Sequence, residues 1–582
     1  MLISALNEYY DCLAEAGRVC PEGCSYQKIS HMIMLAPDGS ISDIIDIREA
    51  GEPDKKGKIQ YNPIDMLLPE RTQKPGIDFN IIEHRPLYIF GLNYNKGTGT
   101  FTPDDGKNRA RKSHECFVKG NLEYIEGMSG ETVERYRRFI ESWNPENETE
   151  NEHLLKLGKI YAAQGTYFCF APDGHPENPL NSPDSDIMRR VMSERNEPDG
   201  DEYLCPVLGE KLPAARIHGK IKGVLGGKAT GGLLVCFNSA AEESYGKSQS
   251  YNTGISYRAM KRYTEALNIL ISDRHHRMYL DDMTIVFFAM TKDDSRETDM
   301  FQAMFGNESS VKAEELDTIL NSAFQELEKG RSMDLSSLDI DENTMFYMAG
   351  LTPNNSRIAQ KFLYRGKFGA MFNNVVLHQL DMRIEGSKGQ LPLWRIFSEL
   401  KSPKSKNEKT PPPLMASLFS AVLNGGKYPE QLLETAVRRV KTDKAVNYAR
   451  AGIIKGCINR KSRLYKGTEE ITMALDTGNT NQAYLCGRLF AVLEKIQQNA
   501  SGGGLNRTIK DSFFASACAK PCAVFPRLMT LAQYHLKNDE YAVSNNKIIG
   551  EILDKLGGSF PSTLPLNEQG KFIIGYYHQY QN

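Results

Sequence analysis

The sequence predicts an α+β protein, with a large mixed N-terminal domain of strands, hairpins and helices over residues 1–400, a linker over 401–413 and a C-terminal α-helical bundle over 414–582. Short apolar runs bounded by Gly, Pro, Asn and Asp, typical of β-strands, occur throughout the first part. The stretch KSPKSKNEKTPPPL is charged, rich in proline and free of apolar periodicity, as expected of a linker. After it, apolar residues recur almost wholly at helical spacing with short breaks, which favours a bundle.

The first half of the mixed domain is predicted from local patterns. It begins with a helix whose apolar residues share one face: Leu2, Leu6, Tyr9 and Leu13. KISHMIMLAPDGSISDIIDI, residues 28–47, predicts two strands joined at the turn 37–40, because Pro fixes φ and Gly accepts positive φ. PLYIFGLNY, residues 86–94, predicts another strand, and the polar stretches 144–153 and 172–186 predict surface loops.

The second half contains a glycine-rich segment, GKIKGVLGGKATGGLLVCFN at residues 219–238, which predicts a loop running into an apolar strand. A helix follows, capped by Ser256, with its apolar face formed by Met260, Tyr263, Leu267 and Leu270. TIVFFAM at 284–290 and MFYMAGL at 345–351 predict buried strands. SRIAQKFLYRG alternates between a basic and an apolar side, with Arg357, Lys361 and Arg365 on one and Ile358, Phe362 and Tyr364 on the other.

In the helical part, two apolar stripes predict two long helices, and SGGG at 501–504 ends the second. The stripes are Val446, Ala449, Ile453 and Cys457, and Leu485, Leu489, Val492 and Ile496.

The net charge also differs between the first 400 residues and the rest of the chain. Residues 401–582 hold 25 Lys and Arg and 14 Asp and Glu, so the first 400 residues hold the other 46 basic and 59 acidic residues. The two balances, +11 and -13, suggest that the C-terminal part meets a polyanion. The densest basic stretch, 438–466, has ten basic residues and one acid, Asp443. Nucleic acid is one candidate because phosphate contacts release counterions, and a solvated helical face is the alternative.

Several function classes are excluded or disfavoured. No apolar run of 18 residues exists, and an N-terminus without a basic region is not a signal peptide. Eleven scattered cysteines then suggest reduced thiols in a cytoplasmic protein. The glycine-rich segment lacks the P-loop pattern, since Ala229 follows Lys228. Neither the spaced pairs Cys20–Cys24 and Cys518–Cys522 nor His275-His276 with Asp281-Asp282 forms a recognisable metal site. We expect no enzyme, no cofactor and no metal.

Four segments together resemble one family, the large subunit of the type I-C (subtype I-C/Dvulg) CRISPR surveillance complex, Cascade. They are GGLLVCFNSAAEESYGKSQSYNTGIS at 231–256, FYMAGLTPNNSRIAQKFLYRGKFG at 346–369, the run from AYLCGRLF to LAQYHL at 483–536, and LPLNEQGKFIIGYYHQ at 564–579. Weaker similarity lies at the N-terminus and at PERTQKPGIDF…LYIFG near residues 69–91. The sequence departs from the pattern at LLVCFN, where a serine is expected before Phe237, and at EHRPLY.

The resemblance implies specific partners. Such a subunit sits at the 5′-handle end of the CRISPR RNA beside the handle-binding and backbone subunits, and it has no membrane role. Its N-terminal domain inspects target double-stranded DNA for the protospacer-adjacent motif and helps to open the strands. Its helical bundle guides the displaced strand, and the subunit offers a docking surface to a helicase–nuclease. Sequence choice along the target would come from RNA–DNA pairing.

Two groups of site residues are expected on these grounds. The motif-reading group mixes lysines for phosphates with amides for base edges, and comprises Lys220, Lys222, Lys228, Thr230, Asn238, Ser244, Lys247, Gln249 and Asn252. The alternative for Asn238 and Asn252 is that they cap turns. The displaced-strand group comprises Arg438, Arg439, Lys441, Arg450, Lys455, Arg460, Lys461 and Arg463.

The resemblance also implies a second product of the same gene, a small subunit made by internal translation. Met473 is the expected start, which gives 582-473+1 = 110 residues, and Met415 is the alternative. Two other function classes stay open at this point. A nuclease acting on the displaced strand would need a metal-ligand cluster, and a purely structural scaffold would bind only RNA or protein.

Overall fold

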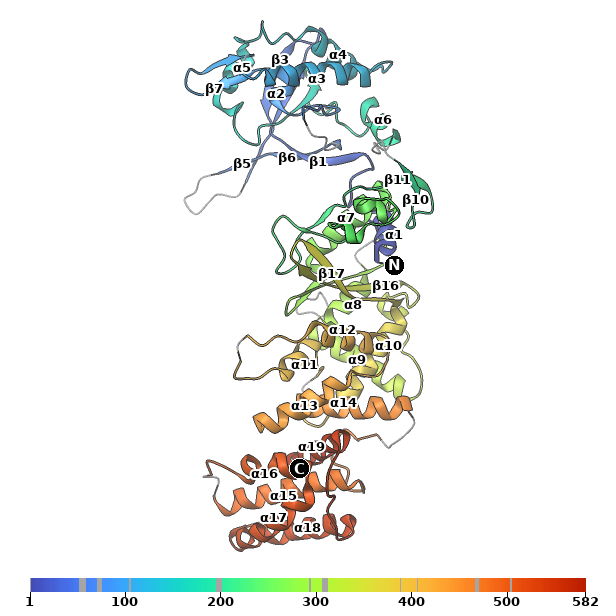
Figure 1. Ribbon diagram of the computed structural model, residues 1–582, viewed down its shortest axis with the longest axis vertical. Helices are drawn as coiled ribbons and strands as arrows, with labels where there is room; N and C mark the ends of the chain where they lie inside the picture. The colour runs from blue at the N-terminus through green and yellow to red at the C-terminus, as the bar shows by residue number, and fades with distance from the viewer. Residues whose placement is uncertain are drawn as a thin grey trace. The chain divides into compact units, whose positions relative to one another are not determined.

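The computed structural model of the chain (Figure 1) describes residues 2–51, 59–70, 76–103, 106–194, 201–292, 295–305, 312–387, 389–405, 407–465, 470–502 and 505–582. The chain forms two compact units. Unit 1 consists of residues 1–12, 217–243 and 262–582, and unit 2 consists of residues 13–216 and 244–261. The chain therefore leaves unit 1 and returns to it twice.

Unit 2 is built around a three-stranded sheet of order β3-β2-β9, with β2 antiparallel to β3 and parallel to β9. Every residue of β2 and β9 is buried. Helix α4 covers these strands, and aromatic side chains fill the space between the helix and the sheet. The elements are β1 Cys24–Ile29, β2 His31–Leu35, β3 Ile41–Asp46, β4 Glu49–Ala50, β5 Tyr61–Asn62, β6 Ile64–Pro69, α2 Pro86–Phe90, β7 Asn93–Asn95, β8 Thr100–Thr102, α3 Arg109–Tyr124, α4 Glu131–Ser142, α5 Glu152–Leu157, β9 Phe168–Pro172, α6 Asp186–Glu194, β10 Glu202–Leu204 and β11 Lys211–Pro213.

Unit 1 contains a six-stranded sheet of order β12-β13-β17-β16-β15-β14, antiparallel except for the β13–β17 pair. Its strands are β12 Lys220–Ile221, β13 Gly232–Leu233, β14 Arg277–Leu280, β15 Met283–Ala289, β16 Met345–Asn354 and β17 Arg357–Lys367. The helices of the chain that reach or follow this sheet are α1 Leu2–Glu15, α7 Tyr257–Ser272, α8 Arg296–Phe305, α9 Ala313–Glu328, α10 Phe368–Met382, α11 Leu393–Leu400, α12 Pro412–Leu423, α13 Glu430–Asp443, α14 Tyr448–Tyr465, α15 Gln482–Ala500, α16 Ile509–Ala519, α17 Pro521–His535, α18 Ala542–Leu556 and α19 Leu566–Gln581.

Strand β15 is buried along its whole length because both of its faces are covered. Phe287 packs against Phe301 of α8, with ring centroids 4.6 Å apart. The next residue, Phe288, points to the other side of the strand. Its ring centroid lies 4.5 Å from that of Tyr9 in α1, and its ring stacks on Tyr347 of β16. This confirms the predicted N-terminal helix and the predicted buried strands, and the Ser256 hydroxyl caps α7 by accepting the Ala259 N–H.

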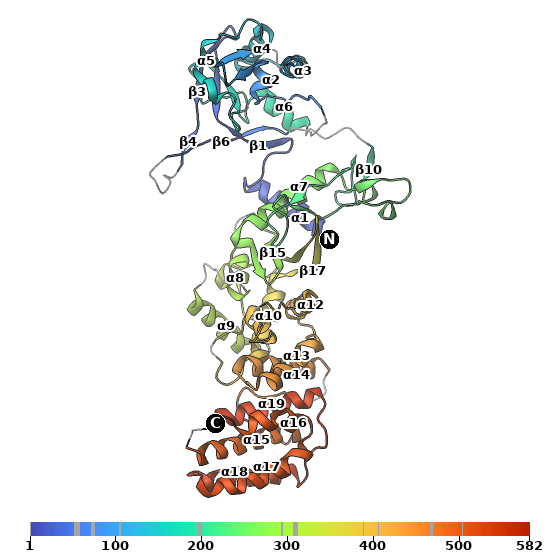
Figure 2. The same ribbon diagram turned by 60° about the vertical axis from the view of Figure 1, so that its left-hand side comes forward.

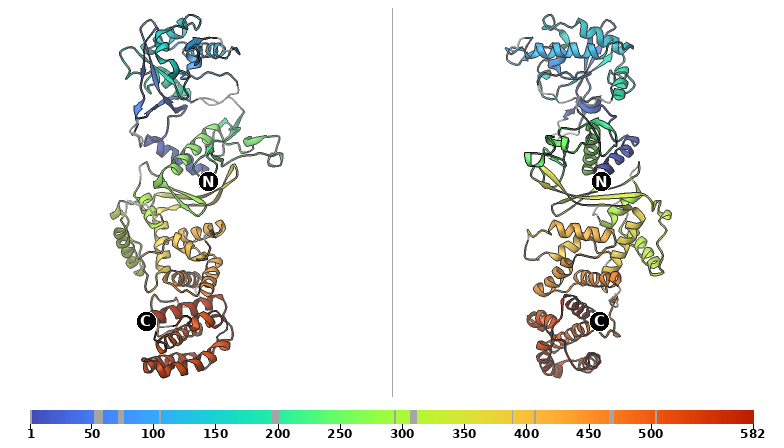
Figure 3. Two further views of the ribbon diagram at one scale, coloured as in Figure 1. Left: turned by 90° about the vertical axis from the view of Figure 1, so that its left-hand side faces the viewer. Right: turned by 45° about the vertical axis from the view of Figure 1, so that its right-hand side comes forward.

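The last five helices, α15 to α19, pack together as a bundle (Figure 2 and, in red, Figure 3). Its centre is the pair α15 and α19, which approach so closely that a side chain at Gly487 would meet the backbone of Phe572, and one at Gly575 the backbone of Tyr484. The predicted α+β class, with a helical C-terminal part, is thus confirmed. Gly503 and Gly504 of the predicted SGGG break lie outside the described residues.

Two local predictions are wrong. PLYIFG is not a strand but the helix α2, because Pro86 fits the first helical position and Gly91 ends the helix with φ 64°. The apolar run LLVCFN contributes only its first residue to β13, and residues 234–238 form no strand. Its backbone pairs with β17 at one residue, Leu233, before the chain turns away.

The predicted linker 401–413 lies within unit 1, so no boundary between the two compact units falls there. Its ends are tied to the turn between β14 and β15. Lys401 Nζ lies 2.5 Å from Asp281 Oδ1, Lys409 Nζ lies 2.6 Å from Asp282 Oδ2, and Asp281 also accepts the Thr410 N–H. Lys406 lies outside the described residues. An independent domain over 414–582 stays a prediction. Within the described residues, no helix has the length and apolar character needed to cross a bilayer.

Candidate nucleic-acid interface

The glycine-rich loop of unit 1, residues 219–231 including the short strand β12, is held by hydrogen bonds to α7 and β15. Asn268 of α7 accepts the Lys222 N–H at 2.8 Å and donates to the Lys220 carbonyl at 3.1 Å. Thr284 of β15 accepts the Leu225 N–H at 2.9 Å. Three glycines of the loop take positive φ, between 73° and 83°, which other residues adopt only with strain. The hydrogen bonds therefore fix the backbone of this loop, and the positive φ angles require glycine at three of its positions.

The predicted contact residues on this loop face solvent. The side chains of Lys220, Lys222, Lys228 and Thr230 are exposed, as is Asn238 just beyond the loop. The segment after it is held by Glu242, which accepts the Asn238 N–H and pairs with Arg357 at 2.9 Å. The hydrogen bond from Arg357 lowers the pKa of the Glu242 carboxyl. These five predicted residues are thus available to a phosphate backbone.

The other four predicted residues belong to unit 2, where they shape one turn. Ser244 and Lys247 form an isolated antiparallel bridge around Tyr245 and Gly246. Both central residues have positive φ, 54° and 71°, as in a type I′ turn. Tyr245 is 99% exposed, so a tyrosine stands in a strained conformation with its ring entirely in solvent. Its residue type alone did not single it out.

Asn252 holds this turn and has no free donor. Its Oδ1 accepts the Ser244 N–H at 2.9 Å, and its Nδ2 donates to the carbonyls of Lys247 at 2.7 Å and Gln249 at 2.8 Å. Both amide hydrogens of Asn252 are thus used within the loop, which favours the alternative that Asn252 caps a turn over the prediction that it reads base edges. Gln249 accepts from Arg216 at 3.4 Å, and the Lys247 ammonium lies 4.3 Å from the Tyr203 ring centroid.

The basic stretch in α13 and α14 is mostly internal. Arg450 is buried and donates to Glu399 at 2.9 Å and to Asp443 at 2.8 Å, and Arg439 also pairs with Asp443. Burial opposes ionisation of Asp443, but the hydrogen bonds from both arginines outweigh it and keep its pKa below the usual value. These two arginines neutralise carboxylates of the protein rather than phosphates.

A second internal cluster surrounds Asp381 of α10. Its carboxylate accepts from Arg460 Nε at 2.6 Å and from Arg463, and its carbonyl accepts from Lys455 Nζ at 3.1 Å. Arg460 is 1% exposed, and burial lowers the pKa of Lys455 to about 8. The physical reason is that α14 contacts α10, α11, α13 and α19, so its polar side faces protein as well.

The displaced-strand group as a whole stays a prediction, but the structure buries half of its members. Arg439, Arg450, Lys455 and Arg460 are buried, and Lys441, Lys461 and Arg463 are half-buried with partners. Arg438 is the one member of the group with an exposed side chain, and Lys466 lies outside the described residues. Exposed basic side chains occur instead on the bundle and its loops: Lys495, Arg507, Lys520, Arg527, Lys537 and Lys547.

Met473, the expected internal start, lies in the segment that precedes the bundle and is 47% exposed. Its carbonyl accepts the Glu385 N–H at 2.8 Å. Residues 482–581 then contain α15 to α19.

The two histidines and two aspartates considered as a metal site, at 275–276 and 281–282, do not come together around one point. Asp281 and Asp282 pair with lysines, as described, His275 is exposed, and the ring of buried His276 contacts the Phe287 carbonyl. Among the described residues, no three His, Cys, Asp or Glu side chains are placed to hold a metal ion.

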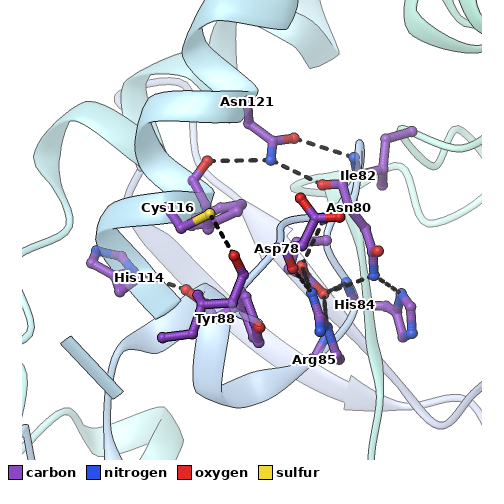
Figure 4. Close-up of polar contacts among 12 residues, drawn as sticks. Asp78, Asn80, Ile82, His84, Arg85, Tyr88, His114, Cys116 and Asn121 are labelled. Atoms are coloured by element: carbon purple, nitrogen blue, oxygen red, sulfur yellow. Dashed lines mark hydrogen bonds and ion pairs between the residues drawn. The ribbon is translucent and has the colours of Figure 1, made fainter. Parts of the chain in front are cut away.

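A buried polar network in unit 2 fixes residues 78–88, the segment of weaker family similarity (Figure 4). Asn121 of α3 donates to the Asn80 carbonyl at 3.0 Å, and its side-chain oxygen accepts the Ile82 N–H at 3.2 Å. Glu83 is fully buried and pairs with Arg85 at 2.6 Å. Ile82 takes φ 55°, which a β-branched residue adopts only under tight constraint. The network uses its charges internally, as expected of a structural support.

Comparison with known proteins bears on the whole chain. No curated protein shows a significant match. A family model described as CRISPR-associated protein (Cas_Csd1) matches residues 6–582. The match spans both units and the bundle, in agreement with the collinear similarity described above. The chain belongs to the Cas_Csd1 family of CRISPR-associated proteins.

Proposed function

We propose that this protein is the large subunit of a type I-C CRISPR surveillance complex and inspects duplex DNA for the motif that flanks a target. In this role it lies at the 5′-handle end of the CRISPR RNA, beside the handle-binding and backbone subunits, helps to open the strands and recruits the helicase–nuclease. Membership of the Cas_Csd1 family supports a CRISPR large subunit. The finer roles rest on the family resemblance and on the surfaces described here.

The observation that carries the proposal is the Tyr245 turn. A side chain that is 99% exposed on a turn clamped by Asn252 is a rigid aromatic projection. Flat side chains can enter a base step, unstack it and so promote strand separation, and aromatic rings then stack on the freed base. Tyr245 is the residue of the motif segment with this capacity, and Asn252 positions it.

The lysines of the glycine-rich loop have a different role in the proposal. Lys220, Lys222 and Lys228 are exposed on a fixed loop, and an ammonium group contacts phosphate without reading the base. Their removal should weaken binding to every duplex and reduce the slope of log affinity against log salt by about 0.9 per lost phosphate contact. A loss confined to one flanking sequence would contradict this assignment.

The test uses the reconstituted complex and two targets, a fully paired duplex and one already opened at the first base pairs. Tyr245→Ala should slow opening of the paired duplex, measured by permanganate reactivity of unpaired thymines, and leave the opened target bound normally. Tyr534→Ala, another exposed tyrosine, is the matched control. Equal behaviour of Tyr245→Ala and wild type on the paired duplex would remove the strand-opening role.

The proposal includes no catalytic step. Purified protein with Mg²⁺ or Mn²⁺ should leave single- and double-stranded DNA intact. Cleavage that copurifies with the protein and disappears in His275→Gln would favour a nuclease. Failure to bind bare duplex that carries the flanking motif, at any salt concentration, would favour a structural scaffold.

We also propose that translation from Met473 supplies a small subunit of 110 residues, since 582-473+1 = 110. The five-helix bundle that follows Met473 supports this, as do its exposed basic residues, which suit a displaced single strand. Expression of Met473→Leu should remove the short species from the intact mass of the complex. Persistence of that species at unchanged mass would exclude this start.

A further inference from the structure

A cavity of about 390 Å³ opens in unit 1 beside β14, the edge strand of the six-stranded sheet. This volume lies at the lower end of the range of about 300–1,000 Å³ seen for small-molecule sites. Its walls come from β14 and the turn before it, from α8, from the start of α11 and from α12. The lining residues are Arg274, Arg277, Met278, Tyr279, Leu280, Gln302, Phe305, Leu393, Trp394 and Phe419.

The cavity has an apolar floor and an aromatic rim. Phe305 and Phe419 are buried, with ring centroids 6.3 Å apart. At the rim, Tyr279 and Trp394 are each 45% exposed. Two large aromatic side chains at one opening suit a flat ligand, because each ring offers a face for stacking.

One buried polar atom of the wall has no partner. Gln302 is 4% exposed, its Nε2 donates to the Arg274 carbonyl at 3.0 Å, and its Oε1 accepts no hydrogen bond within the described structure. A buried acceptor left unpaired is costly, so it marks a place for a donor. A ligand with an amino group on a flat ring meets this requirement.

Among the described residues, two arginines and no carboxylate line the cavity. Arg277 is held in place, because it donates to the Ile271 carbonyl and its guanidinium lies 5.1 Å from the Tyr279 ring centroid. Arg274 is exposed, and the described part of the chain provides no acidic partner for its side chain. The opening is therefore positively charged and suits an anion such as a phosphate.

We propose that this cavity binds one unpaired nucleotide, with its base toward Gln302 and the aromatic rim and its phosphate toward Arg274 and Arg277. An amino-bearing base, such as adenine, satisfies Gln302 Oε1, stacks on Trp394 or Tyr279 and covers the apolar floor. The source is either a nucleotide of a single strand or a free nucleotide. The inference extends the proposed function to a specific base-binding site, and it does not depend on motif reading.

The test uses the protein's own fluorescence. The chain has two tryptophans, and Trp143 is buried in unit 2, so Trp143→Phe leaves Trp394 as the reporter. This variant is titrated with dAMP, deoxyadenosine and a ten-residue oligodeoxyadenylate. We expect quenching by dAMP with an affinity at least about tenfold higher than for deoxyadenosine, because charge-assisted hydrogen bonds to phosphate are strong. Quenching by the oligonucleotide at equal or lower concentration identifies a strand as the source, and quenching by dAMP alone identifies a free nucleotide.

Two variants test the assigned contacts. Arg274→Ala should remove the preference for dAMP over deoxyadenosine, whereas Arg331→Ala, a matched exposed arginine outside the cavity, should retain it. Gln302→Met should abolish the preference for dAMP over the purine nucleotide that lacks the 6-amino group. Because Gln302 is buried and its variant can fail to fold, the Arg274 result decides on its own.

Absence of quenching by both dAMP and the oligonucleotide would overturn the proposal. Tighter binding of an acidic aromatic peptide, N-acetyl-Asp-Phe-amide, than of any nucleotide would also overturn it and assign the cavity to a partner protein. No duplex, CRISPR RNA or flanking motif enters these titrations, so their failure is distinguishable from failure of the proposed function.

Discussion

The glycine-rich loop and the basic stretch of α13 and α14 are both rich in lysine or arginine, yet the structure uses them in opposite ways. The loop presents Lys220, Lys222 and Lys228 to solvent on a backbone fixed by Asn268 and Thr284. The helical stretch turns its arginines inward to the carboxylates described above, such as Asp381. A high local charge therefore indicates nucleic-acid binding only where the charges lack internal partners.

The two regions also differ in the free energy that is needed to remove their charged groups from water. An exposed lysine keeps its hydration, whereas a buried arginine must recover its lost hydration from a well-placed carboxylate. Arg460 does so at 2.6 Å from Asp381. The internal ion pairs should thus dominate stability, and the loop lysines should dominate binding. The following predictions separate these two contributions.

The largest effect is expected for Asp381→Asn, which leaves Arg460, Arg463 and Lys455 near an uncharged group. Breaking one side of a buried ion pair costs about 3–5 kcal/mol in the free energy of unfolding. Urea unfolding followed by circular dichroism should show a large drop in the midpoint. A loss below about 1 kcal/mol would mean that the cluster is hydrated and the contrast with the loop is overstated.

Removal of the loop anchor should have a smaller and local effect. Asn268→Ala takes away the acceptor of the Lys222 N–H and the donor to the Lys220 carbonyl. Each unsatisfied group costs about 1–3 kcal/mol if buried. Hydrogen exchange should accelerate over residues 219–231 while the Asp381 region remains protected. Faster exchange throughout unit 1 would show that the loop is not an independent feature.

Acid should weaken both regions through buried neutral histidines. Burial lowers the pKa of His218, before the loop, to about 4 and that of His378, beside the Arg460 cluster, to about 3. Since unfolded histidine has a pKa of about 6.5, the unfolded chain binds more protons below that value, and stability present above pH 6.5 is lost as the pH falls. By about pH 5.5 each histidine should cost about 1 kcal/mol.

The check compares urea midpoints at neutral and mildly acidic pH. His378→Gln should reduce the acid-induced loss, and His275→Gln, at an exposed position, should leave it unchanged. An equal pH dependence in all three proteins would assign the acid sensitivity to other groups.

The smallest effect is expected for Glu430→Gln. Glu430 pairs with Lys427 at 2.7 Å and Lys461 at 3.4 Å at the surface of the helical region. Exposed ion pairs contribute about 0.2–1 kcal/mol, so the urea midpoint should hardly move. A loss as large as that of Asp381→Asn would remove the distinction between exposed and buried pairs on which the comparison rests.

Sequence patterns predicted the elements with strong burial signals and missed those decided by tertiary contacts. The stripe of α1 and the uninterrupted apolar run of β15 were sufficient, because burial on one face or both leaves a regular pattern. PLYIFG was too short for its periodicity to separate helix from strand. Asp381 lies 79 positions from Arg460, so no local pattern reveals their pairing.

The candidate site also contains some residues that could be predicted from the sequence and others that could not. Exposure of Lys222 and Lys228 could be expected from their glycine neighbours, which disfavour regular structure, whereas Lys220 is exposed on the short strand β12. Tyr245 could not be found, because its significance lies in a positive φ and complete exposure rather than in its residue type. The cavity beside β14 joins residues from 274 to 419, which meet only in the folded chain.

The interrupted path of the chain through unit 1 has a consequence for biosynthesis. Helix α1 is synthesised well before the strand that it packs against, because its partner Phe288 lies 279 positions after Tyr9, since 288-9 = 279. At a synthesis rate of about 5–20 residues per second, the apolar face of α1 waits on the order of tens of seconds for the sheet that covers it. Most of unit 2 is synthesised in this interval and can fold first. Efficient production in a cell should therefore depend on a chaperone that shields the apolar face of α1 until the sheet has been made.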